Sequence, residues 1–315
     1  YIPLKGEIKQ KIGLLVSDCI DISKNDWDES EISWDFERHP FIKNVSSNNK
    51  SNLSLKISDI YTQWETKKNQ ILDRLKINEE TINRILIDLY NLQEELTPEV
   101  EEKDMSLQIP HLQRDIKSFM SYFMGCVFGR YNFHRVKVIP TGKELVFSKD
   151  SLFHIDRDNV IPITDDNYFS EDIITLFDEF LVACYGKETL EENLDFIAQA
   201  LGKKEESSRG TIRNYFVVDF YKDHLKTYQK KPIYWLYDSG KQNGFKALVY
   251  MHRYDEDTTG RVRVDYLHQV QKAYERATAN LQDDIVNSKD AKEITQLQKR
   301  IEKITKQLKE CKDYD

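Results

Sequence analysis

A glycine-bracketed loop, DSGKQNG at 238–244, carries the side chains whose types best suit a chemical role. Gln242 and Asn243 can form paired hydrogen bonds with an adenine edge, and Lys241 can contact a guanine edge or a phosphate. The loop lies in PIYWLYDSGKQNGFKALVYMHRYDED (232–257), the most apolar hairpin of a chain that is otherwise mostly charged helix. A rigidly held polar tip suits a nucleic-acid groove, and a plain turn that needs its glycines is the alternative.

The common catalytic signatures are absent from the sequence. Lys241 lacks the upstream glycine and the following hydroxyl that a phosphate-binding loop requires. Glu-x-Lys tripeptides at 7–9 and 65–67 have the letters of a metal-dependent nuclease site, but both lie in helical patterns rather than on a strand. His224 and His252 have aromatic neighbours, which favours packing or hydrogen bonding over catalysis. The sequence therefore indicates no catalytic residue, no cofactor-binding residue and no metal ligand.

The formal net charge of −8 hides two segments of opposite sign. Residues 156–195 contain twelve Asp or Glu and two Lys or Arg, whereas residues 203–276 contain fifteen Lys or Arg and ten Asp or Glu. The two segments could pack on each other, or the basic one could face a polyanion such as double-stranded DNA. The second interpretation predicts DNA contacts from Arg209, Arg213, Lys230, Lys231, Lys241, Gln242, Asn243, Lys246, Arg253, Arg261 and Arg263.

Composition predicts a cytoplasmic protein. The mean hydropathy is −0.65 and 32% of the residues are charged, which is typical of a large solvated surface. The longest nearly apolar run, 119–129, is shorter than the roughly 20 residues that cross a bilayer, so no membrane partner is expected. The four cysteines lie far apart, which argues against a zinc site or a disulfide framework. The chain opens at Tyr1 directly in a helical pattern, which is typical of a fragment of something longer.

Residues 1–100 are predicted to form a helical connector. Apolar residues at helical spacing predict helices at 4–22 and 53–77. Asn78 has the character of an N-cap, since two glutamates follow it, and it predicts a further helix that closes near Pro98. The last two helices would form an antiparallel pair.

Residues 101–257 are predicted to form a mixed α/β recognition region. A Thr-Gly turn between β-rich runs predicts strands within 136–150, and LFHIDRDNVIPI (152–163) predicts a further strand or two. Apolar residues on both faces of the hairpin at 232–257 predict that it packs between two layers, with only its tip reaching solvent. The other elements are expected, in chain order, as a helix from after Pro110 to about Tyr131, helices at about 170–185, 188–201 and 209–229, and strands near 232–238 and 244–254.

Residues 258–315 are predicted to form a coiled-coil helical arm. A heptad seam repeats at steps of three and four residues through Ile294, Leu297, Ile301, Ile304, Leu308 and Cys311. A near-matching series from 267 to 285 precedes it, and NSKD at 287–290 supplies a turn. An antiparallel hairpin is therefore expected, with a dimerising coil as the alternative. The whole chain is predicted to be helix-rich α+β.

Several blocks of the sequence carry a resemblance to a known family. The hairpin at 232–257, with NDWDESEISWDFERHP, LIDLYNLQEELTPEV, SFMSYFMGCVFGRY and ETLEENLDFIAQALGKK, resembles the C-terminal portion of the PglX family, the adenine-specific DNA methyltransferases of BREX phage-defence systems. The chain is also similar to large single-chain restriction-modification enzymes, in which a methylase half precedes a helical spacer and a target-recognition region.

The resemblance implies an S-adenosylmethionine-dependent enzyme that flips an adenine out of duplex DNA and methylates its exocyclic nitrogen. This chain departs from the family pattern, because it contains no G-x-G and no Pro-Pro of an Asn-Pro-Pro-Tyr motif. The resemblance therefore implies that the cofactor and the catalytic domain lie before Tyr1. It predicts a target-recognition part whose partners are double-stranded DNA, the upstream methyltransferase domain and other defence-system subunits. A protein-interaction scaffold that never contacts DNA is the alternative.

Overall fold

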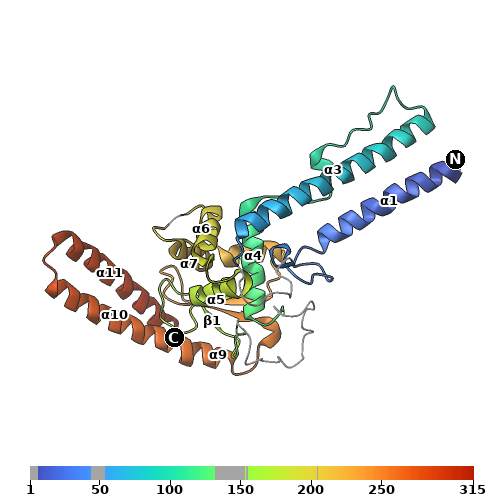
Figure 1. Cartoon of the computed structure of the whole chain (residues 1–315). Coiled ribbons are helices and arrows are strands. Elements are labelled where there is room, and N and C mark those ends of the chain that lie inside the picture. The colour runs from blue at the N-terminus through green and yellow to red at the C-terminus, as the bar shows by residue number, and fades with distance from the viewer. Residues whose placement is uncertain (1–5, 44–53, 132–152, 154, 204) are drawn as a thin grey trace.

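The computed structural model describes residues 6–43, 54–131, 153, 155–203 and 205–315. Two elongated helical pairs project from a central body (Figure 1). The helices are α1 (Gly6–Trp27), α2 (Pro40–Lys43), α3 (Ile57–Tyr90), α4 (Leu112–Val127), α5 (Ile173–Tyr185), α6 (Leu190–Leu201), α7 (Ser208–Val218), α8 (Phe220–Thr227), α9 (Thr258–Arg261), α10 (His268–Asn287) and α11 (Ala291–Tyr314). The strands are β1 (Ile161–Pro162), β2 (Tyr234–Asp238) and β3 (Lys246–Tyr250). The predicted helix-rich α+β class is confirmed.

One projecting pair, the α1/α3 arm, corrects a prediction. Residues 57–90 form one continuous helix of 34 residues, so the helical pair expected on either side of Asn78 is wrong. The side-chain amide of Asn78 donates to Asp18 Oδ2 of α1 at 2.6 Å, and Arg74 also donates to the Asp18 carboxylate. Asn78 therefore bonds across the arm rather than capping a new helix.

The body is built around α4, whose residues from Ile116 to Val127 are buried on nearly every side. A helix that is apolar all round needs neighbours all round, and α5, α6 and α8 pack against it. Aromatic rings fill the junctions, as between Phe123 and Phe177, whose centroids lie 4.9 Å apart. This core supports one face of the sheet.

The three antiparallel strands have the order β1-β3-β2, with β3 in the middle. Tyr234, Leu248 and Tyr250 pack into the core around α4. Ala247 and Val249 point to the other face and pack into a second core. The prediction that the apolar hairpin lies between two layers is confirmed, because alternate residues of β3 enter different cores.

The second core includes the C-terminal helical hairpin of α10 and α11, the predicted turn falling between them at 288–290. Tyr274 of α10 and Ile304 and Cys311 of α11 are buried in the core that holds Val249. The C-terminal helical hairpin is therefore confirmed, and its near end packs on the sheet. The coiled-coil character of its seam stays a prediction, as do the domain boundaries at 100 and 257.

Three further expectations fare differently. The predicted helix at 209–229 is two helices, α7 and α8, divided at Asp219. The strand expected in 152–163 is only the two residues of β1. Asn159 has a φ of 68°, and its main-chain N–H donates to Asp156, so the preceding residues form a turn instead. The β-rich run at 136–150 lies outside the described residues.

Among the described helices, none is both long and apolar enough to cross a membrane.

Candidate nucleic-acid interface

The main chain of the loop at 239–244, here called the tip, is held by one carboxylate of α11. Glu310 Oε1 accepts hydrogen bonds from Ser239 Oγ at 2.9 Å and from the Gly244 N–H at 3.0 Å. Glu310 Oε2 accepts from the Gln242 N–H at 2.7 Å. Hydrogen bonds to a charged acceptor are stronger than neutral ones, so this carboxylate holds the tip firmly against the helix.

The carbonyl groups of the tip are held by neutral side chains. Gln307 Nε2 lies within hydrogen-bond distance of the Gln242 carbonyl oxygen, at 3.3 Å, and of the Asn243 carbonyl oxygen, at 3.4 Å, and it also donates to Asp165 Oδ2 at 3.0 Å. The Tyr274 hydroxyl donates to the Gly244 carbonyl at 2.7 Å. A Cβ on Gly244 would lie 2.7 Å from the Gln307 carbonyl oxygen, so glycine permits this close approach.

The prediction that only the tip reaches solvent needs a correction. Trp235 of β2 is 41% exposed, so the tip is not the only part of the hairpin that reaches solvent. At the tip, the side chains of Lys241 and Gln242 are exposed and Asn243 is partly exposed, but the main chain is docked on α11. Sequence reasoning missed Glu310 and Gln307. Nothing in a heptad pattern marks a polar residue beside the seam as the partner of a distant loop.

Two of the predicted DNA-contact arginines pair with the acidic segment. Arg213 forms two hydrogen bonds with the Asp172 carboxylate, at 2.6 and 2.7 Å, and its side chain is only 15% exposed. Arg209 bridges Asp178 and Glu191. These contacts favour the first interpretation of the charge pattern, in which segments 156–195 and 203–276 pack on each other.

Four more predicted cations have partners within the protein. Arg253 donates to the carbonyl oxygens of Phe128, Asp156 and Arg157, at 2.9 to 3.2 Å. Burial is the main cause that lowers the pKa of Arg253. The ion pairs of the other three are Lys246 with Asp238, Arg261 with Asp255, and Arg263 with Asp315. Each of these four cations therefore already has an acceptor within the protein.

Lys230 and Lys231 lie at the opposite end of β2 from the tip. Both are exposed, and neither forms an ion pair with a described residue. Lys230 has a φ of 64°, in the turn between α8 and β2. His224 Nε2 holds the start of the strand by accepting from the main-chain N–H groups of Ile233 and Tyr234, at 3.1 and 3.2 Å. The prediction that His224 is hydrogen-bonded and packed is confirmed.

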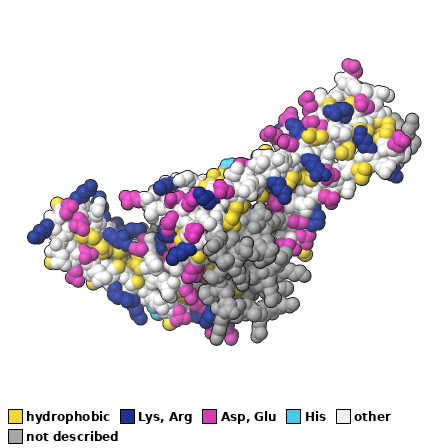
Figure 2. Space-filling model, in the orientation of Figure 1, with side chains coloured by type: hydrophobic (Ala, Val, Ile, Leu, Met, Phe, Trp, Pro, Cys, Tyr) yellow, Lys and Arg dark blue, Asp and Glu magenta, His cyan; other side chains and the backbone are white. Residues whose placement is uncertain are grey.

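Helix α11 places further lysines beside the tip. Lys306 and Lys309 line a shallow groove of about 480 Å³ together with Ser239, Gln242, Glu310, Asp313 and Tyr314. The helix carries seven Lys or Arg and four Asp or Glu. Figure 2 shows Lys and Arg side chains on the visible face of the C-terminal helical hairpin, with Asp and Glu between them. Lys306 pairs with Glu302, at 2.7 Å, whereas Lys309 forms no ion pair with a described residue.

The described residues do not fit an S-adenosylmethionine site. Nucleotide-type cofactors commonly bind at the carboxyl ends of parallel strands, beside a glycine-bearing turn into a helix. The only sheet among the described residues is small and antiparallel, and none of its strands leads through such a turn into a helix. No group of three or more His, Cys, Asp or Glu in the described ranges has a metal-binding arrangement.

Comparison with known proteins finds that the chain is similar to one part of adenine-specific methyltransferases. No family model matches it. It is 42% identical over 317 aligned residues to the adenine-specific methyltransferase PglX of Lacticaseibacillus casei, an alignment that covers all of this chain and 26% of that protein. It is 33% identical over 329 aligned residues to the adenine-specific methyltransferase BrxX of Escherichia coli, covering 96% of this chain and 26% of that protein. The chain spans about a quarter of the length of these curated relatives. The resemblance to PglX is therefore confirmed, and the chain is related over its whole length to one part of these adenine-specific methyltransferases.

Proposed function

We propose that the chain is the target-recognition part of a site-specific adenine-N6 DNA methyltransferase of a phage-defence system, of the BREX or restriction-modification kind. It would position DNA in the cytoplasm for an S-adenosylmethionine-dependent catalytic domain elsewhere in the same polypeptide. The names of its relatives support the enzyme class. The observation that carries the DNA-binding role is the docked tip, which holds its main chain against α11 while the Lys241 and Gln242 side chains stay exposed.

The tip has the chemistry of a DNA-reading element. A glutamine can hydrogen-bond an adenine edge through two atoms, and a lysine can contact guanine or phosphate. Lys306 and Lys309 lie beside Gln242 in the groove, where they would meet the phosphates that flank the base contact. Phosphate contacts set the register of the protein on the duplex, and Gln242 would read the base.

Lys230 and Lys231 form a second candidate phosphate contact. They lie before β2 and the tip lies after it, and a strand of this length spans roughly 17 Å. Two cationic sites so far apart would meet different phosphates of one duplex. In this proposal Arg209, Arg213, Lys246, Arg253, Arg261 and Arg263 position the fold through their protein partners.

Binding to a fluorescent duplex, measured by anisotropy across a salt series, tests the proposal. The wild-type affinity should fall steeply with salt. The double variant Lys241→Ala/Lys309→Ala should reduce the log–log slope by roughly 0.9 for each phosphate that the protein no longer neutralises. The matched control is Lys9→Ala/Lys67→Ala, which removes the same charge from the α1/α3 arm. Equal slopes for the two double variants would contradict the proposed surface.

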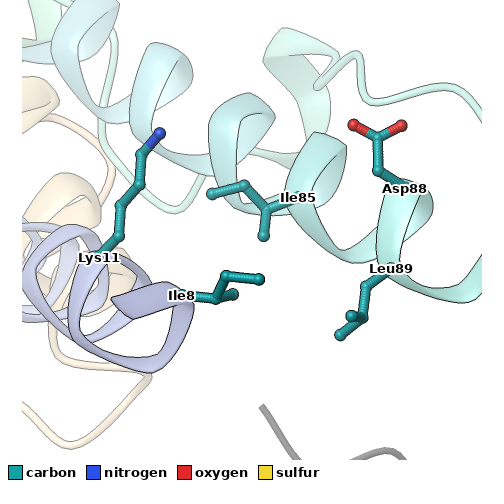
Figure 3. Close-up of a pocket in the computed structure, with 5 residues that line it drawn as sticks. All are labelled: Ile8, Lys11, Ile85, Asp88 and Leu89. Carbon is teal, nitrogen blue, oxygen red and sulfur yellow. The ribbon is translucent and has the colours of Figure 1, made fainter. Parts of the chain in front are cut away.

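A protein-interaction scaffold is the second candidate, and the α1/α3 arm favours it. Leu14, Ile20 and Trp27 of α1 are 68%, 61% and 53% exposed. Between the two helices of the arm, Ile8, Ile85 and Leu89 line a groove of about 380 Å³ with Lys11 and Asp88 (Figure 3). Apolar side chains in these positions are typical of a protein contact. A folded chain that binds no duplex even at low salt would favour this scaffold, which would dock other defence-system subunits.

A further inference from the structure

We propose that Glu310 is the positioning residue of the tip, and that the C-terminal helical hairpin is thereby part of the recognition site rather than an independent arm. The inference rests on the proposed function for its DNA-binding consequence. Its structural half stands on the hydrogen bonds between α11 and the tip alone.

Asn243 in the tip has a backbone conformation that costs free energy, so contacts from outside the tip help to hold it. Asn243 has a φ of 53° and Gly240 a φ of 137°, both in the left-handed half of conformational space. A non-glycine residue in this region costs free energy and keeps its conformation only where its surroundings impose it. The Gln242 and Gly244 N–H groups on either side of Asn243 both bind the Glu310 carboxylate.

Glu310 and Gln307 together select one path of the main chain. Glu310 accepts from N–H groups, and one turn earlier on the same helix Gln307 donates to the carbonyl groups of Gln242 and Asn243. The N–H groups of the tip face the Glu310 carboxylate, and its carbonyl groups face the Gln307 amide, when the main chain follows its observed course.

This support would raise DNA affinity by reducing the conformational entropy that the tip loses when it binds. A loop that is already in its binding conformation loses less conformational freedom when it meets a partner. Glu310 itself faces the tip and need not touch DNA, so its effect would act through Lys241 and Gln242. The same helix carries Lys306 and Lys309, so the tip and these phosphate-binding candidates would move as one unit.

The first test changes Glu310→Gln, which keeps the shape of the side chain but replaces one acceptor oxygen with a donor. Amide hydrogen exchange at Gln242 and Gly244 should accelerate at least about tenfold, because the variant cannot form hydrogen bonds to a charged acceptor. Glu302→Gln on the same helix is the matched control, since Glu302 is exposed and pairs with Lys306 instead of the tip. Unchanged exchange at Gln242 and Gly244 in Glu310→Gln would overturn the proposal.

The second test asks whether Glu310 acts through the tip side chains. Duplex affinity is measured for Glu310→Gln in the wild-type background and in Lys241→Ala/Gln242→Ala. A positioning role predicts about tenfold weakening in the first background and little in the second, since coupled residues are not additive. Equal weakening in both backgrounds would mean general destabilisation and would overturn the positioning role. If wild-type chain binds no duplex, the recognition function fails, and the exchange experiment still decides whether Glu310 holds the tip.

Discussion

The two ends of the apolar hairpin are held in the same way by different chemistry. At the start of β2, one nitrogen of His224 accepts from the N–H groups of Ile233 and Tyr234. At the tip, the Glu310 carboxylate accepts from two N–H groups and one hydroxyl. His224 is 3% exposed and lies among aromatic rings, 4.7 Å from the Tyr234 ring centroid. Glu310 lies beside solvent in a groove lined by lysines.

The environments decide how each acceptor responds to acid. Burial, with the charge of Arg130, lowers the pKa of His224 to about 4, so the imidazole stays neutral and can accept. Burial alone would raise the pKa of Glu310, but the hydrogen bonds from Gln242, Gly244 and Ser239, with the charge of Lys246, bring it below its ordinary value of 4.5. Each group can accept these hydrogen bonds only when it is deprotonated. As pH falls, protonation of His224 therefore destabilises the fold first, and protonation of Glu310 does so only in stronger acid.

The largest expected effect is the acid sensitivity of His224. The unfolded state gains this proton below about pH 6.5 and the folded state only near pH 4, so stability is present above 6.5 and is lost as pH falls to about 4. The loss approaches about 3 kcal/mol, at 1.36 kcal/mol per pH unit. Urea unfolding of wild type and His224→Gln should show this dependence only in wild type. The exposed His252→Gln is the control, and the same pH dependence in His224→Gln would contradict the account.

The next effect concerns the docking of the tip. Gly244→Ala would force a methyl group against the Gln307 main chain and should destabilise the protein by about 1–3 kcal/mol. Gly260→Ala in α9 is the control, because nothing lies within 4 Å of its added Cβ, and it should be neutral or stabilising. Denaturant midpoints measure both. Equal midpoints for the two variants would show that the tip does not rest on α11.

Glu310 is expected to have a smaller effect on stability than His224, and to lose it over a lower pH range. The stability difference between wild type and Glu310→Gln should be about 1–2 kcal/mol at neutral pH. The pKa of Glu310 lies below 4.5, so this difference should persist at pH 4.5 and vanish as pH falls through that lower value. Urea titrations at neutral pH, at pH 4.5 and in stronger acid measure it. A difference that does not change with pH would mean that the carboxylate charge has no part in holding the tip.

The smallest effect on stability is expected at the groove. Lys306→Ala removes an exposed pair with Glu302, and such surface pairs contribute less than about 1 kcal/mol. Its thermal midpoint should therefore match that of wild type while its affinity for duplex falls. A large loss of stability would mean that Lys306 supports the fold rather than contacting a ligand.

The sequence predicted those parts of this arrangement that depend on periodicity. Apolar residues at successive positions within 232–257 indicate a strand pair with apolar side chains on both faces, and the seam through Ile304 and Cys311 indicates the helix that packs on it. Both patterns are local consequences of strand and helix geometry. Neither prediction requires information about which distant parts of the chain lie side by side.

The missed features all depend on a distant partner. Asn78 followed by two glutamates has the local signal of a helix start, but it lies inside α3 and its side chain bonds to Asp18 of α1 instead. Likewise, Arg213 is one more cation in a basic segment until Asp172 is placed beside it. Glu310 gave no signal at all, since an acidic residue next to a heptad seam is ordinary on a solvated helix face.

Lysine acetylation footprinting tests the central claim most directly. The full chain is acetylated with and without a duplex several helical turns long, and modification at each lysine is read by mass spectrometry. The account predicts that DNA protects Lys241, Lys306 and Lys309 at the docked tip, and leaves Lys9 and Lys67 on the α1/α3 arm as reactive as before. Protection of the arm lysines alone, or of no lysine under conditions where the duplex binds, would contradict it.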